Sequence, residues 1–166
     1  MDDSGGFLSN YTSRLDAKGR VSIPAPFRAV LGRDGFEDLY VHPSLDVEAV
    51  DCGGHALLRE IHELLRPLSP YSEERDLFST ALIGTSEILK IDTEGRVILS
   101  ESAKTYAGIA TEVTFVGHGF KFQIRTGNII DAGRMPAPPG VKLRIFSIAC
   151  CKSGNAPLDQ CNHGCF

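Results

Sequence analysis

The stretch Asp16-Ala-Lys-Gly-Arg-Val-Ser-Ile-Pro24 decides the fold, because its pattern returns 76 residues later as Asp92-Thr-Glu-Gly-Arg-Val-Ile-Leu-Ser100. Asp, Gly, Arg and Val occupy the same places in both copies. A single Asp-x-x-Gly-Arg stretch is compatible with an ordinary β-turn. Two copies in register, each followed by a helix signal at the same offset, indicate a duplicated structural unit.

The repeated residues have the chemistry of a tight turn that leads into a strand. The side chains of Asp16 and Asp92 can accept hydrogen bonds from backbone amides ahead of them, as in Asx-turns. Gly19 and Gly95 suit a positive φ, and Arg96 is expected to be held by Asp92. We therefore assign these five residues to the structure of the two turns.

Each copy continues with a short helix and two further strands. Pro24 and Ser100 stand at the expected helix starts, and Gly32 and Gly108 at the expected C-terminal caps. Strands are predicted over 39–42, 45–50, 113–116 and 120–124. Because a unit of roughly 45 residues buries little core by itself, we expect the two copies to pair and share one core.

A helical linker is predicted between the copies. Its first helix carries apolar residues at helical spacing, namely Ala56, Leu57, Leu58, Ile61, Leu64, Leu65 and Leu68. The second helix opens at Ser72 and closes at Gly84, and its inward-facing residues are expected to be Leu77, Phe78, Ala81 and Leu82. The predicted domains are a first unit at 7–52, the linker at 53–82, a second unit at 83–125 and an atypical, disordered tail at 126–166.

The composition is that of a soluble globular protein. The chain has 166 residues, 42% of them hydrophobic and 23% charged, and a formal net charge of −4. No apolar run approaches the roughly 18 residues of a membrane span, and the acidic start lacks the basic residues of a secretory signal. We therefore expect a cytoplasmic protein without a membrane partner. Because the net charge is negative, any nucleic-acid site must be a local basic patch.

The two turn sequences together resemble the signatures of the MraZ family of bacterial transcriptional regulators, and Tyr71-Ser-Glu-Glu-Arg-Asp-Leu-Phe78 in the linker also fits. The resemblance covers about residues 5–124. It implies an α+β, β-rich fold of tandem, pseudo-symmetric SpoVT/AbrB-like units that form a double-split β-barrel with short covering helices. It further implies a ring-shaped homo-oligomer that binds short tandem repeats in its own promoter.

The resemblance places the DNA-contacting loop on Lys18 and Arg20, and the local charge agrees. Five cations lie within residues 14–33 against one acid, Asp16; they are Arg14, Lys18, Arg20, Arg28 and Arg33. Arginine can read guanine bidentately, whereas lysine adds affinity and salt dependence at phosphates. We predict double-stranded DNA binding by Lys18, Arg20, Arg14 and Arg28, although a structural pair between Arg20 and Asp16 is the alternative.

The second copy differs in charge, because Glu94 occupies the place of Lys18. We therefore expect the first copy to recognise DNA and the second to complete the barrel or the subunit contacts. A weak patch on an acidic protein needs many copies, and a ring could raise avidity by roughly 10²–10⁴. The prediction is a nucleoid-associated regulator that represses its own operon, the division and cell-wall gene cluster.

The chain stops resembling the family after Ile124. Residues 126–166 are rich in Pro and Gly, and the chain has no Trp where the family usually continues with one and then a charged helix. A shifted reading frame is one explanation and natural divergence the other. Cysteines and a histidine in this tail could be considered zinc ligands, but no Cys-x2-Cys pair is present; the residues concerned are Cys150, Cys151, Cys161, His163 and Cys165.

Other chemistry finds little support in the sequence. Cys52, His55 and His62 do not form a known metal or thiol-catalyst motif, and no nucleophile elbow or phosphate-binding loop is present. We therefore expect no enzymatic activity, metal, cofactor or small-molecule substrate. The alternative functions are an AbrB-like antitoxin or protein-interaction module, and a purely structural ring-forming protein.

Overall fold

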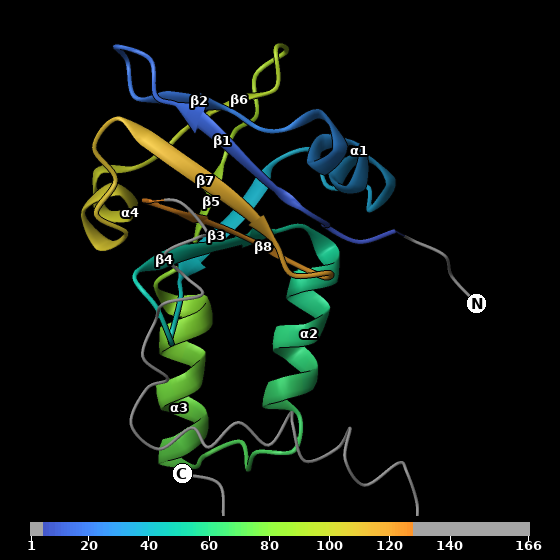
Figure 1. Cartoon of the computed structure of the whole chain (residues 1–166). Helices are drawn as coiled ribbons and strands as arrows, with labels where there is room; N and C mark the ends of the chain where they lie inside the picture. Colours follow the sequence, from blue (N-terminus) through green and yellow to red (C-terminus); the bar gives the residue numbers. More distant parts are fainter. Residues whose placement is uncertain (1–4, 128–166) are drawn as a thin grey trace, which may run out of the picture. The chain divides into compact units, whose positions relative to one another are not determined.

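The computed structural model describes residues 5–127 and is an α+β, strand-rich fold, as predicted. Its elements are β1 (Asn10–Arg14), β2 (Arg20–Ser22), α1 (Ala25–Arg33), β3 (Leu39–Pro43), β4 (Ala49–Gly53), α2 (His55–Leu65), α3 (Glu73–Ser79), a π-helical turn η1 (Thr80–Gly84), β5 (Glu87–Leu89), β6 (Arg96–Ile98), α4 (Glu101–Tyr106), β7 (Glu112–Gly117) and β8 (Phe122–Arg125). The order β–β–α–β–β therefore occurs on both sides of α2, α3 and η1 (Figure 1).

The strands form two antiparallel sheets. The larger has six strands in the order β1-β7-β8-β4-β3-β5, and the smaller pairs β2 with β6. Strands β1 and β5, β7 and β3, and β8 and β4 hold corresponding places in the two copies, so the larger sheet has corresponding strands at equal distances from its centre. The first strand of each copy pairs with a strand of the other copy, which ties the copies into one folded unit.

One apolar core lies between these sheets. Phe27 of α1 contacts the rings of Phe7, Tyr11, Phe115 and Phe122, which come from the segment before β1, from β1, and from the distant strands β7 and β8. Residues of β2 and β6 close the core from the other side. The core therefore holds the small β2–β6 sheet, and with it both turns, against the large sheet.

The helix starts follow the sequence signals more closely than the helix ends. Ser72 and Ser100 accept hydrogen bonds from the amides of Arg75 and Ala103, both at 3.2 Å, so the predicted cap at Ser100 is confirmed and Ser72 caps the helix that it was predicted to open. Helix α1 follows directly after Pro24. The prediction that Gly32 ends this helix is wrong, because the helix continues to Arg33 and the left-handed backbone conformation falls on Gly35, with φ +72°.

Two predicted strands and two predicted inward residues need correction. β4 and β8 begin after the predicted starts at 45 and 120, because the preceding residues form turns that leave Leu45 and Phe120 half-exposed. Leu64 of α2 is 53% exposed and Leu77 of α3 is 67% exposed. Leu64 lines a pocket instead of lying under another element, whereas Leu77 does not belong to the apolar cluster that joins α2 to η1.

Part of the predicted chain organisation concerns residues that the structure does not describe. Residues 128–166, including the predicted tail and its cysteines, lie outside the described residues. Within residues 5–127, no helix is long and apolar enough to cross a lipid bilayer.

Candidate nucleic-acid interface

The first turn is organised by the carboxylate of Asp16. Its Oδ1 accepts hydrogen bonds from the amides of Lys18 at 2.8 Å and Arg20 at 2.9 Å. Its Oδ2 accepts a third, from Nε of Arg20, at 2.6 Å. Gly19 closes the turn with φ +72°. One side chain thus fixes both the backbone of the turn and the direction of the guanidinium group.

The second turn repeats this geometry. Asp92 accepts from the amides of Glu94 and Arg96, both at 2.9 Å, and from Nε of Arg96 at 2.9 Å. Gly95 has φ +76°. The two turns are therefore nearly the same structure carrying different side chains at the position of Lys18 and Glu94.

These contacts keep both aspartates ionised. The amide of Arg20 is the largest influence that lowers the pKa of Asp16 to about 2, and the guanidinium group adds to it. The pKa of Asp92 is lowered for the same reason, chiefly by the amide of Arg96. The hydrogen bond to Asp92 raises the pKa of Arg96 above its usual value. Each turn therefore holds an ionised aspartate beside the arginine four residues later.

The two turns differ in their net charge and in the ion pairs that their cations form. Within residues 5–127, Lys18 forms no ion pair, and Arg20 pairs only with Asp16 through Nε. In the second turn, Nη1 of Arg96 is also engaged, by Oε2 of Glu94 at 2.5 Å. One acid and two bases leave the first turn with a formal charge of +1, whereas two acids and one base leave the second with −1.

The structure separates the four predicted DNA-contacting residues. Arg28 lies across the second turn, where a Cβ on Gly95 would collide with its side chain. Arg14 is exposed on β1 and pairs with Glu112 at 3.7 Å. Only Lys18 and Arg20 belong to the first turn itself.

Lys104 of α4 is a cation that the sequence analysis missed. Its Nζ lies 3.4 Å from the place where a Cβ on Gly19 would stand, and it pairs with Glu101. Lys104 follows Arg28 by the same 76 residues that separate the two turns. Each copy thus places a helix cation beside the turn of the other copy. Applying the 76-residue offset to Arg28 would have identified Lys104 from the sequence.

Both turns are accessible from one side. The turn between β1 and β2 and the turn between β5 and β6 rise beyond the small β2–β6 sheet, away from α2 and α3 (Figure 1). The side chains of Arg20 and Arg96 are each 29% exposed. A duplex approaching this side would meet the turns before any helix of the linker.

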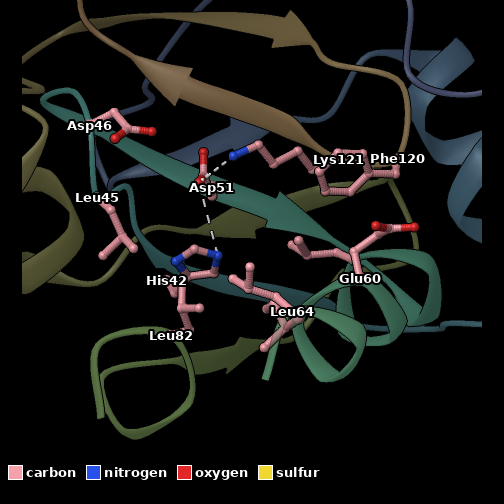
Figure 2. A pocket seen from close by; sticks show the side chains of 11 residues that line it. His42, Leu45, Asp46, Asp51, Glu60, Leu64, Leu82, Phe120 and Lys121 are labelled. Carbon is pink, nitrogen blue, oxygen red and sulfur yellow. Dashed lines mark hydrogen bonds and ion pairs between the residues drawn. The ribbon is translucent and has the colours of Figure 1, made fainter. Parts of the chain in front are cut away.

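A pocket of about 260 Å³ lies against α2, on the other face of the large sheet. At its base, Asp51 of β4 accepts from Lys121 Nζ at 2.6 Å and from Gln123 Nε2 at 2.8 Å, and His42 lies 4.0 Å away (Figure 2). Burial lowers the pKa of His42. No buried polar side-chain atom of the described residues lacks a hydrogen-bond partner, so this cluster is a satisfied part of the fold.

The described residues offer no metal centre and no reactive thiol. No group of three or more potential metal ligands occurs among residues 5–127. Cys52 is fully buried, and burial raises the pKa of its thiol well above the usual value. The site with the most distinctive geometry is therefore the pair of turns.

Known bacterial proteins match most of this chain. A protein from Beijerinckia indica subsp. indica, named transcriptional regulator MraZ, is 78% identical over 118 residues, which are 71% of this chain and 72% of the relative. The chain belongs to the MraZ family. The MraZ protein of Methylocella silvestris is 79% identical over 119 residues, covering 72% of this chain and 73% of that one.

More distant MraZ proteins match over the same length. That of Azorhizobium caulinodans is 58% identical over 118 residues, covering 71% of this chain and 75% of the relative. No family model matches the chain. The predicted membership of the MraZ family is confirmed, and these relatives carry the name of regulators, not of enzymes.

Proposed function

We propose that this chain is a DNA-binding transcriptional regulator that contacts double-stranded DNA through the turn containing Lys18 and Arg20. The observation that supports this most is the excess positive charge of an exposed turn whose arginine is held by Asp16 through Nε alone. Among the described residues, neither Nη group of Arg20 forms an ion pair. Two Nη groups of one arginine can donate together to O6 and N7 of guanine. Lys18 would contact phosphate and supply affinity.

The pairing of β2 with β6 and of β4 with β8 supports a specific architecture. We propose two pseudo-symmetric SpoVT/AbrB-like units, at 7–52 and 83–125, that form a double-split β-barrel around the linker at 53–82. Because β1 and β5 cross between the copies, neither unit would be expected to fold without the other.

We further propose that the chain represses its own operon, the division and cell-wall gene cluster, as a cytoplasmic, nucleoid-associated protein. One basic turn on a chain of net charge −4 is expected to bind DNA weakly. A ring-shaped homo-oligomer engaging short tandem promoter repeats would overcome this by avidity. If each turn enters a major groove on one face of the DNA, repeats about 10–10.5 bp apart are expected.

An electrophoretic mobility-shift titration on the DNA upstream of the chain's own coding sequence tests this proposal. Arg20→Ala should abolish specific binding while the far-UV circular dichroism and the thermal unfolding midpoint stay near those of the wild type. Arg33→Ala is the matched control, because Arg33 donates to the carbonyl of Gly5 at 3.3 Å and lies in α1 outside the turn. Wild-type binding by Arg20→Ala would remove this arginine from the interface.

A further inference from the structure

We propose that the second turn, Asp92 to Arg96, is a DNA-contacting site held inactive by one carboxylate, that of Glu94. This inference rests on the proposed function of the first turn. It assigns Glu94 as the residue that limits each chain to one DNA-contacting turn, and Arg96 and Arg28 as the cations that would otherwise contact the phosphate backbone.

The two turns share one backbone conformation. The corresponding amide-to-carboxylate distances differ by at most 0.1 Å, and the two glycines have φ values of +72° and +76°. Arg20 and Arg96 are both 29% exposed and are both held through Nε. The second turn therefore presents its guanidinium group as the first one does.

The surrounding cations do not explain the difference in charge between the two turns. Arg28 packs across Gly95, as Lys104 lies beside Gly19. The second turn thus has a helix cation of its own, contributed by the other copy. Ala17 is replaced by the uncharged Thr93, so the difference in charge comes from the residue two places after the aspartate, lysine in the first turn and glutamate in the second.

Glu94 engages the guanidinium group of Arg96 and adds negative charge to the second turn. Its Oε2 lies 2.5 Å from Nη1 of Arg96, whereas neither Nη group of Arg20 donates to a carboxylate among the described residues. The side chain of Glu94 is 65% exposed, and its negative charge would repel an approaching phosphate. An ion pair this exposed contributes little to stability, so removing it should leave the fold intact.

Reversing the charge of Glu94 provides a gain-of-function test. Fluorescence anisotropy is measured over a range of salt concentrations, with a labelled duplex from the upstream DNA and a scrambled duplex of the same composition. Glu94→Lys should raise affinity for both duplexes by roughly tenfold at low salt, and each added phosphate contact should steepen the salt dependence by about 0.9 in log–log slope. Glu94→Gln, which frees Arg96 without adding a cation, should give a smaller gain.

The decisive variant is the double substitution Arg20→Ala with Glu94→Lys. It should recover binding to DNA that Arg20→Ala alone has lost, because the second turn then acts in place of the first. Glu60→Lys is the matched control, since it adds the same charge on α2, away from the turns. An equal gain from Glu60→Lys would overturn the inference, because the effect would then follow net charge.

Failure of this inference and failure of the proposed function give different results. If Lys18→Glu abolishes binding while Glu94→Lys changes neither affinity nor salt slope and does not rescue Arg20→Ala, the second turn is not a latent site and the first remains the interface. If Lys18→Glu and Arg20→Ala both bind as the wild type does, the proposed interface fails and this inference fails with it.

Discussion

Val21 lies directly opposite Val97 in the antiparallel β2–β6 pair, and both side chains are buried. These valines hold the same place in the two copies of the repeated sequence, 76 residues apart. The pairing therefore puts the two turns at the two ends of one short ribbon. The exchange of Lys18 for Glu94 is the one charged difference between the turns and decides how charge is distributed along this edge of the molecule.

The carboxylate of Asp16 should titrate with a pKa of about 2 in the folded protein. Because folding lowers this pKa, the contribution of the carboxylate to stability is present above its unfolded-state pKa, near 4, and is lost as the pH falls toward about 2. Carbon-detected NMR titration of the side chain measures this directly.

Arg20→Ala should raise the pKa of Asp16 only part of the way to its usual value. The amide of residue 20 is the largest cause of the depression and remains in the variant, whereas the guanidinium group is lost. A pKa of Asp16 at the usual value in the wild type would contradict the described turn.

Gly95→Ala should destabilise the protein more than Gly19→Ala. Both positions have positive φ, at a cost of about 1–2 kcal/mol for alanine. At Gly95 the new methyl group would also collide with Cδ and the guanidinium group of Arg28, which would have to leave the turn, whereas at Gly19 it would meet only the end of Lys104 at 3.4 Å. Urea denaturation measures the difference in the free energy of unfolding.

Gly35→Ala serves as the control for these glycine substitutions. Gly35 also has φ +72°, with no atom near its missing Cβ, so its alanine variant should cost about as much as Gly19→Ala. In an Arg28→Ala background, the extra cost at Gly95 should disappear. Persistence of that cost would show that Arg28 does not pack across the turn.

The local features of this fold were predictable because they depend on residues close in sequence. The turn around Asp16 and the cap at Ser100 are formed within four residues. The placement of Arg28 beside Gly95 was not predictable from local sequence, because it depends on the pairing of β2 with β6. The exposure of Leu64 likewise depends on which element covers α2, and hydrophobic periodicity does not specify that.

Lys121→Met should lower the free energy of unfolding by about 3 kcal/mol. Its ammonium group lies 2.6 Å from the carboxylate of Asp51, which is only 4% exposed, so removal would leave a buried charge with Gln123 as its remaining close donor. Chemical denaturation at neutral pH gives the measurement. Adding Asp51→Asn to Lys121→Met should recover much of the loss, because no uncompensated charge then remains.

Lys90→Met is the matched control for Lys121. Lys90 also lies 2.6 Å from a carboxylate, that of Asp38, but its side chain is well exposed. An exposed pair contributes at most about 1 kcal/mol. Equal losses in the two methionine variants would show that the Asp51 cluster is no more important to the fold than a surface pair.

Phe27→Ala should be the most damaging of these substitutions, with a loss of about 3–5 kcal/mol. The Phe27 ring is fully buried and contacts four other aromatic rings, from β1, β7, β8 and the segment before β1. Because these rings connect α1 to the large sheet, the cavity should also loosen the attachment of β2 and its turn.

Phe120→Ala is the control for Phe27→Ala. At a half-exposed position beside the α2 pocket, it should cost about 1 kcal/mol. Thermal and urea unfolding compare the two, and hydrogen exchange at the amides of β2 reports the loosening; unchanged exchange there would show that the turn is held independently of the aromatic core.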